Sequence, residues 1–535
     1  MGQTILLLAQ ALLASGAAVA SPAYDVPTTP NKLGKPLEGF VSYSIEFSSF
    51  PEFAGNKSSP NEFSYNLLKN LGSIMGSDPY IRVGGNTQDY ALYNASQKEA
   101  LIGTVDPRRS PDYPTTIEIG PAYFESYNTW PGFKFSHGLN LGLGGNRSTG
   151  WETLVETAPL VCKTLEGKLY TWEYGNEPDL FSVSAQGPVR PSTFNESTYV
   201  WQWLNGTKEI RSQVKKHCPN MEPKFMAPSF AGRFSELKTW QAGLNADNNV
   251  ELFSTHNYIS GATSPGVTLQ GTLMNFGVTK KSVDTHVTSY NGIFGSTGNT
   301  SAPPLIFGET NSLYNQGRPG LSNSFGAALW GVNFHLYSAS VGFKRVHFHQ
   351  GTNYRYQAWQ PVDTDLATKG TKAPYYGSVA VAALLRNSVA QPVSISNIPL
   401  GTDQAEAAYA AHFTKSQKLG RILVINMHSY NTTVDGAGLD PLPQVPERPN
   451  KTYTFNVKAA DGQLVRVQRL MANGSDAITG ITFDGRSYNW ELEAGKPVRL
   501  HNVTIGETVV VKGGQVTVGL PDSSAAILSF TNSCS

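Results

Sequence analysis

The chain has 535 residues, 40% of them hydrophobic and 15% charged, so it is expected to bury a large core in more than one domain rather than to be disordered. Its 41 basic and 40 acidic residues give a formal charge of +1 without a long basic run, which argues against a nucleic-acid partner. Three cysteines, Cys162, Cys218 and Cys534, allow at most one intramolecular disulfide, and their spacing does not decide which two would pair.

Residues 1–20 form a short apolar run that ends in small residues before Ser21, a pattern typical of a cleaved secretory signal peptide and too short for a membrane span. Ten Asn-x-Ser/Thr sequons support passage through a eukaryotic secretory pathway. They begin at Asn56, Asn94, Asn146, Asn195, Asn205, Asn299, Asn431, Asn450, Asn473 and Asn502. We therefore expect a secreted, extracellular glycoprotein with no membrane partner.

From residue 40 to 387, short β-rich apolar segments alternate with longer segments of helical periodicity. Strands are predicted over residues 40–47, 80–85, 139–144, 169–175, 224–230, 251–258, 304–309 and 344–351. Helices are predicted over residues 61–75, 151–167, 197–217, 323–342 and 373–387. This alternation predicts an α/β fold, a (β/α)8 TIM barrel.

After Asn387 the pattern changes to short alternating strands separated by Gly, Asn and Asp turns. Residues 388–535 are therefore predicted to form a C-terminal all-β sandwich domain.

Glu177 is the first candidate for chemistry, because active sites of TIM barrels lie at the carboxyl ends of the strands. It follows the predicted strand 169–175 in the run Asn176-Glu177-Pro178, a rigid turn that would hold a carboxyl group over the barrel mouth. The alternative is structural: Asn176 would cap a helical turn, and Glu177 would only favour the helix N-terminus.

Glu309 ends the predicted strand 304–309 and is the second candidate; a structural pair with an arginine is its alternative. Together the two carboxyl groups fit glycoside cleavage, which needs one protonated group to assist the leaving oxygen and one ionised group to attack the anomeric carbon. The charge of Glu309 should raise the pKa of Glu177. Retention requires carboxyl groups roughly 5 to 5.5 Å apart, a distance that the sequence does not give.

Other chemistries find less support. No G-x-S-x-G elbow indicates a serine hydrolase, and no dinucleotide or nucleotide loop is present, so no cofactor is expected. His347 and His349 share one face of a predicted strand and His256 ends another, which raises the hypothesis of a metal site. Hydrogen bonding inside the barrel mouth is the favoured role of these histidines, and no metal is expected.

The runs at residues 80–89, Asn176–Pro178 and Gly308–Ser312 resemble glycoside hydrolase family 79, which includes heparanase and fungal β-glucuronidases. The resemblance extends from about residue 35 to the C-terminus and implies a barrel joined to a sandwich, with residues 21–39 possibly joining the sandwich. It further implies a retaining mechanism with Glu177 as acid/base and Glu309 as nucleophile. Asn176 would contact the sugar 2-hydroxyl, and Tyr258 would orient the nucleophile.

The resemblance also implies substrate contacts. Glu46 and Asn86 would bind the sugar at the closed end of the site, or else serve as structural hydrogen-bond partners. The uronate carboxylate would be held by Tyr314, the backbone N–H of Gln316 and Tyr354, whose alternative is aromatic packing at the rim. Relatives carry consecutive glycines where this chain has Asn315-Gln316-Gly317, and a tilted loop there would put the uronate preference in question.

The function expected from the resemblance is exo-acting release of terminal β-linked glucuronic acid, with or without a 4-O-methyl group, by a monomer. A heparanase-type endo enzyme is one alternative, although the chain has no evident basic stripe for a sulfated polymer. A related barrel enzyme acting on neutral sugars is another. A secreted carbohydrate-binding protein with an inert barrel is the alternative outside enzymes.

Overall fold

The computed structural model describes residues 22–143, 148–184, 187–386 and 389–530. The predicted signal peptide, the sequon at Asn146, Cys534 and the predicted domain boundary at residues 387 and 388 lie outside the described residues.

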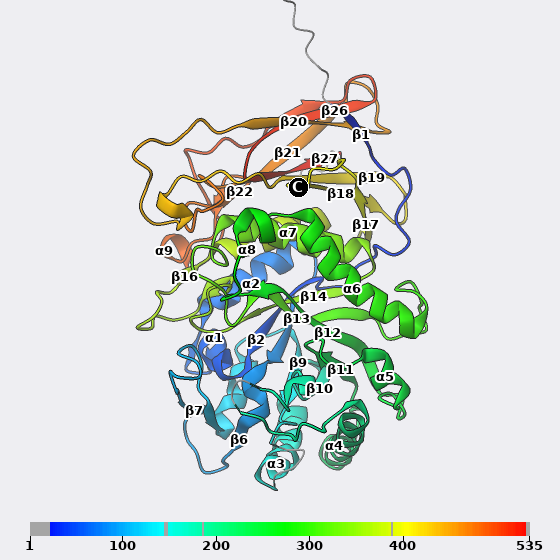
Figure 1. Ribbon diagram of the computed structural model, residues 1–535, viewed down its shortest axis with the longest axis vertical. Coiled ribbons are helices and arrows are strands. Elements are labelled where there is room, and N and C mark those ends of the chain that lie inside the picture. Colours follow the sequence, from blue (N-terminus) through cyan, green and yellow to red (C-terminus); the bar gives the residue numbers. More distant parts are fainter. Residues whose placement is uncertain (1–21, 144–147, 185–186, 387–388, 531–535) are drawn as a thin grey trace, which may run out of the picture.

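Within the described residues, eight parallel strands close into a barrel (Figure 1). They are β2 (Val41–Glu46), β5 (Tyr80–Gly84), β9 (Lys134–Leu139), β10 (Leu169–Tyr174), β11 (Phe225–Phe230), β12 (Val250–Gly261), β13 (Leu305–Tyr314) and β14 (Arg345–Gln350). The strands follow chain order around the barrel, and β14 closes it by pairing with β2. The predicted TIM barrel is confirmed.

The third barrel strand was predicted wrongly. Residues 139–144 were expected to form it, but β9 spans Lys134–Leu139 and the chain leaves the barrel after Leu139. The sequence of β9 contains the polar residues Ser136 and His137. Both are buried because the Ser136 hydroxyl pairs with Thr171 at 2.7 Å and His137 Nδ1 lies 2.5 Å from the Tyr127 hydroxyl.

The helices around the barrel include the five predicted ones, with small shifts at their ends. The barrel helices are α2 (Glu62–Met75), α3 (Ser148–Thr164), α4 (Glu196–His217), α5 (Glu236–Gln241), α6 (Phe276–Phe294), α7 (Phe325–Ser340) and α8 (Ala373–Leu385). Side chains at Asn61, Asn195 and Ser324 cap α2, α4 and α7 by accepting backbone N–H bonds. A Cys162–Cys218 disulfide ties α3 to the end of α4.

Between β5 and β9 a small sheet and a 3-10 helix (Pro121–Asn128) stand in place of a longer barrel helix. The sheet consists of β6 (Ala91–Tyr93), β7 (Leu101–Thr104) and β8 (Thr116–Ile119), and we call residues 91–119 the insert. The loop between β7 and β8, residues 105–115, reaches the barrel mouth, where Asp112 pairs with Arg355 of the loop after β14.

Two sheets form the C-terminal domain. One contains β17 (Val393–Ile398), β18 (Glu406–Phe413), β19 (Leu419–Asn426), β21 (Leu464–Met471), β22 (Thr482–Phe483), β23 (Arg486–Ser487), β24 (Val498–Arg499), β25 (Thr508–Val510) and β27 (Ser524–Ser529). The other joins β1 (Ala23–Asp25), β20 (Asn450–Asn456) and β26 (Gln515–Pro521). A core of alternating apolar residues separates the two sheets.

The barrel and the sandwich share one hydrophobic core. Helices α7 and α8 lie between them, and every residue of both helices is buried (Figure 1). The Tyr409 hydroxyl on β18 donates to Asn333 Oδ1 on α7 at 2.6 Å. Helices that are apolar on all sides need cover on both faces, and the sandwich supplies the second. In the part of the chain that is described, no helix combines the length and apolar character needed to cross a membrane.

Candidate active site

Glu177 lies in a strained turn at the end of β10. Its backbone adopts the left-handed conformation, φ 45° and ψ 50°, which is uncommon for a residue with a side chain. Neighbouring elements hold the turn: the Glu177 N–H donates to the Ser229 carbonyl at 3.0 Å, and the Asn176 N–H donates to Asp89 Oδ2 at 2.7 Å. The Asn176 side chain makes no helix cap, since its Oδ1 accepts from Arg82 instead. Asn176 is therefore not a cap, although Glu177 does stand at the N-terminus of a short 3-10 helix (Pro178–Leu180).

Glu309 lies on β13 and is nearly enclosed, with 7% of its side chain exposed. The Tyr258 hydroxyl donates to its Oε1 at 2.8 Å, and Arg82 Nη1 donates to its Oε2 at 2.7 Å. His349 Nδ1 lies 3.6 Å from the same Oε2. Tyr258 therefore contacts the predicted nucleophile, as expected from the resemblance.

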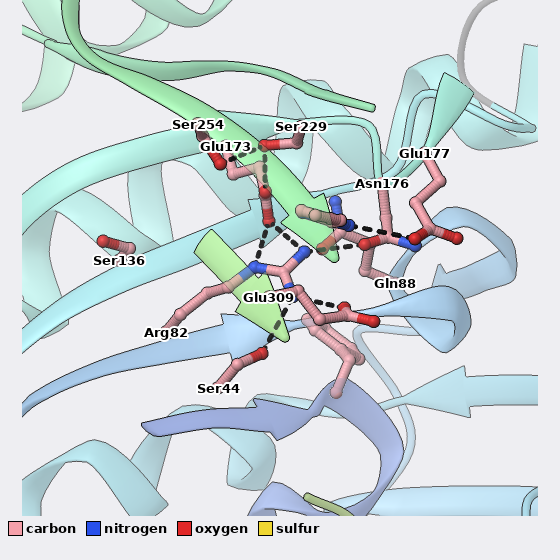
Figure 2. Close-up of polar contacts among 12 residues, drawn as sticks. Ser44, Arg82, Gln88, Ser136, Glu173, Asn176, Glu177, Ser229, Ser254 and Glu309 are labelled. Carbon is pink, nitrogen blue, oxygen red and sulfur yellow. Dashed lines mark hydrogen bonds and ion pairs between the residues drawn. The ribbon is translucent and has the colours of Figure 1, made fainter. Parts of the chain in front are cut away.

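Arg82, which the sequence reasoning missed, joins these groups from the barrel interior (Figure 2). Its fully buried guanidinium donates to Glu309 and Asn176 and also to Glu173 Oε2 and Ser44 Oγ, both at 2.8 Å. The signal was present in the sequence. Arg82 and Glu173 are opposite charges inside two apolar barrel strands, and charged residues are rarely buried without a partner.

The two carboxyl groups differ in protonation. Burial first, and then the charge of Glu309, raise the pKa of Glu177 well above its usual value. Burial also acts to raise the pKa of Glu309, but His349, Arg82 and the Tyr258 hydroxyl outweigh it and hold that pKa well below its usual range. Glu177 is thus poised as an acid and Glu309 as an anion. One oxygen of each lies within 4.8 Å of the other.

The histidines at the site have separate partners. His256 Nδ1 lies 3.0 Å from Glu177 Oε1, and burial lowers the His256 pKa to about 4, so this ring is neutral. Burial also opposes a charge on His349, but Glu309 and Glu46 outweigh it and raise the His349 pKa. His347 donates from Nδ1 to the Phe307 carbonyl at 2.9 Å.

The three histidines form no common ligand group among the described residues. Glu177, His256 and Glu309 do place ligand atoms within 4.8 Å of one another. Arg82 already provides the positive charge at Glu309, so hydrogen bonding accounts for the cluster without an ion.

Glu46 is buried at the end of β2 beside these groups. Its Oε1 accepts from Thr87 N and Oγ1, at 2.9 and 2.6 Å, and its Oε2 accepts from the Tyr354 hydroxyl at 3.0 Å. Asn86 is half-buried and follows Gly85, whose φ of 102° and closeness to Glu46 and His349 leave no room for a side chain. The structure therefore gathers Glu46, Asn86 and Tyr354 at one side of the barrel mouth.

The loop after β13 carries the other predicted contacts. Tyr314 is 47% exposed, with its ring beside Gly261. Asn315, Gln316 and Gly317 all have left-handed φ values, 62°, 61° and 79°. Asn315 and Gln316 thus adopt backbone angles that glycine usually adopts. The loop keeps this conformation although it has two non-glycine residues where relatives have glycines. Tyr356, also missed, is buried with its hydroxyl 3.5 Å from that of Tyr258.

Comparisons with known proteins agree with this picture. The profile of the "Glycosyl hydrolase family 79 C-terminal beta domain" matches residues 408–527. A protein named β-glucuronidase from Neurospora crassa is 58% identical over 530 residues, covering 92% of this chain and 94% of that protein. One of the same name from Aspergillus niger is 52% identical over 503 residues, covering 92% and 91%.

Among solved structures, a 4-O-α-L-rhamnosyl-β-D-glucuronidase from Fusarium oxysporum superposes with a TM-score of 0.73 at 24% identity, covering 95% of this chain and all of that one. A family 51 α-L-arabinofuranosidase from Bifidobacterium longum gives 0.59 at 14% identity, with 95% and 99% covered. At these identities the similarity concerns the fold. The identity to the two fungal relatives over almost the whole chain, together with the matched domain, decides the family: the chain is a glycoside hydrolase and belongs to glycoside hydrolase family 79.

Proposed function

We propose that this enzyme is a secreted, retaining, exo-acting β-glucuronidase that releases terminal glucuronic acid from glycans or glycoconjugates. The observation that carries the proposal is the pair Glu177 and Glu309, two carboxyl groups with oxygens within 4.8 Å and pKa values shifted in opposite directions. The names of the two fungal relatives support the choice of sugar.

In the proposed reaction, the ionised Glu309 attacks the anomeric carbon while Glu177 gives its proton to the leaving glycosidic oxygen. Bonding to the sugar neutralises Glu309, which removes one cause of the high Glu177 pKa. Glu177 then takes a proton from water, and that water displaces Glu309 from the sugar. The short separation of the two groups supports retention, since inversion needs room for water between them.

For the uronate, we propose that its carboxylate binds near the left-handed loop at Gln316, with the hydroxyl of Tyr314 as a donor. The exposure of Tyr314 and the unusual backbone of the loop support this position. Glu46 and Asn176 would contact sugar hydroxyls. Their fixed orientations, set by Tyr354 and Arg82, support a pocket prepared for one sugar.

The test compares hydrolysis of p-nitrophenyl β-glucuronide with that of the glucoside, xyloside and galactoside, for wild type, Glu177→Gln and Glu309→Gln. We expect the wild type to cleave only the glucuronide, Glu309→Gln to be inactive, and proton NMR to detect the β-anomer as the first product. Cleavage of a neutral sugar would overturn the uronate assignment, and the α-anomer as first product would overturn retention. Inactivity on all four substrates would favour an endo enzyme or a binding protein.

Secretion and tolerance of a 4-O-methyl group need separate assays. Expression of the full sequence in a fungal host should deliver an N-glycosylated enzyme lacking residues 1–20 to the medium. Retention of the enzyme inside the cells would contradict secretion. The 4-O-methyl glucuronide should be compared directly with the unsubstituted one.

A further inference from the structure

Arg355 lies where three loops of the barrel mouth meet. It belongs to the loop after β14, and it contacts both the loop after β13 and the loop at residues 105–115 of the insert. The insert follows β5, and β2 lies between β14 and β5 in the barrel. The contact between Arg355 and the insert therefore passes over the end of β2, where Glu46 is located.

The contacts of Arg355 fix the backbone of the neighbouring loop. Its own N–H donates to the Gln316 carbonyl at 2.7 Å, and its Nε donates to the Gly317 carbonyl at 3.2 Å. Holding these two carbonyls fixes two successive peptide planes next to the left-handed residues. The loop proposed to bind the uronate thus depends on Arg355 for its conformation.

Asp112 orients Arg355 from the other side. Its Oδ1 accepts from Arg355 Nη1 at 2.6 Å, and only 4% of the Asp112 side chain and 26% of the Arg355 side chain are exposed. An ion pair this sheltered is screened less by water and salt than a surface pair. Another pair in the same loop, Arg108 with Asp106, has its arginine 88% exposed and provides a natural comparison.

The insert also lies against the wall of the sugar site. The Tyr113 ring lies 6.4 Å from the ring of Tyr354, whose hydroxyl donates to Glu46. The Tyr90 hydroxyl donates to the Pro114 carbonyl at 2.9 Å and anchors the same loop. The insert is thus held beside the residues proposed to contact the sugar.

We propose that Arg355 and Asp112 are positioning residues that set the substrate class. They hold the Gln316 loop in the shape that accepts a uronate carboxylate, and they hold the insert across the end of β2, so that only a terminal uronic acid fits. This inference rests on the proposed β-glucuronidase function and names the residues that make the enzyme uronate-selective and exo-acting.

The test uses Asp112→Asn, Arg355→Lys and the double variant, with Asp106→Asn as a matched control that loses an exposed ion pair of the same loop. KM and kcat are measured for p-nitrophenyl glucuronide and glucoside, and products are analysed from an oligosaccharide whose glucuronic acid is internal and 4-substituted. In both single variants we expect KM for the glucuronide to rise and the glucuronide-to-glucoside ratio of kcat/KM to fall about tenfold, equivalent to 1.4 kcal/mol. Cleavage of the internal residue should become detectable.

The double variant should lose no more than the worse single variant, because both changes break one interaction. The control should match wild type. An unchanged selectivity ratio in Asp112→Asn and Arg355→Lys, even with lowered thermal stability, would overturn the proposal. So would additive losses in the double variant.

Hydrogen exchange separates failure of this inference from failure of the proposed function. In Asp112→Asn, amides of residues 105–115 and 315–317 should exchange faster together, whichever sugar the wild type prefers. If the wild type does not act on glucuronides, the proposed function fails, and coupled exchange still decides whether the two loops are joined. Faster exchange in residues 105–115 without faster exchange in residues 315–317 would overturn the proposed coupling of the two loops.

Discussion

Glu177 and Glu309 have identical side chains, and their surroundings assign them opposite protonation states. Glu177 faces a neutral histidine and a nearby carboxylate, whereas Glu309 faces a guanidinium, a histidine whose pKa is raised by the neighbouring carboxylates, and a hydroxyl donor. The different roles of the two carboxyl groups are therefore set by their surroundings rather than by residue type.

This asymmetry predicts the pH dependence. Glu177 acts while protonated, so kcat/KM for the glucuronide should persist well above the usual pKa of a glutamate and fall as Glu177 loses its proton. Glu309 must be ionised, and its lowered pKa places the acidic limb below its ordinary range. Profiles for wild type and Glu177→Gln should be compared on a glucuronide whose leaving group needs protonation, with the variant followed at its reduced rate. Persistence of the basic limb in Glu177→Gln would show that another group causes it.

Arg82 provides a second prediction. Arg82→Met leaves the buried Glu173 without its cation and should lower the free energy of unfolding by about 3 to 5 kcal/mol. Displacement of Glu309 and Asn176 should lower kcat by about 100-fold or more. Adding Glu173→Gln removes the unpaired charge and should recover part of the stability but none of the activity. Denaturant unfolding and kinetics decide this, and recovery of kcat in the double variant would contradict the role given to Arg82.

The sequence pattern allowed prediction of Glu177 and Glu309, because each lies at or directly after the end of a strand whose own pattern is clear. The role expected of Tyr258 followed only from the family resemblance. A buried partner for Arg82 could have been inferred from the opposite charges of Arg82 and Glu173 in two apolar strands. The contacts of Arg82 with the catalytic groups and the position of Tyr356 depend on which strand faces lie together across the barrel, and a single sequence does not contain that information. Gln316 was placed correctly in its loop, but its left-handed backbone followed only from the structure.

At the level of elements, prediction succeeded for seven of the eight barrel strands, including β12 and β14 with their buried histidines, and failed for β9. Strand β9 was missed because Ser136 and His137 find their partners on other segments. The insert has no helical periodicity, so the expected alternation of strand and helix breaks between β5 and β9. These departures from the regular pattern include the loop proposed to control substrate class.

The Cys162–Cys218 disulfide supports the outer helices, and its loss should affect stability alone. It joins residues 56 apart, for which loop closure predicts a contribution of about 4 kcal/mol. A Cys162→Ala/Cys218→Ala variant should unfold at lower denaturant with unchanged kcat. Cys534→Ala, which leaves this disulfide intact, is the matched control. A loss of activity under native conditions in the double variant would contradict a purely structural role.

On the scale of the whole molecule, the shared core predicts cooperative behaviour. Because α7 and α8 are buried on both sides, barrel and sandwich should unfold in one calorimetric transition. Removing residues 389–535 should expose both helices and leave an aggregating barrel. Two separated transitions in the full chain, or a soluble active barrel without the sandwich, would contradict this expectation.

The parallel pairing of β1 with β20 has a consequence for biosynthesis. The Asn456 side chain donates to Asp25 Oδ1 across 431 residues of chain. At about 5 to 20 residues per second, the ribosome adds that stretch in roughly 20 to 90 s, during which the first strand has no partner. The earliest described segment is therefore among the last to be fixed in place. We expect a nascent chain stalled before residue 450 to leave residues 23–25 open to protease, and the finished chain to protect them.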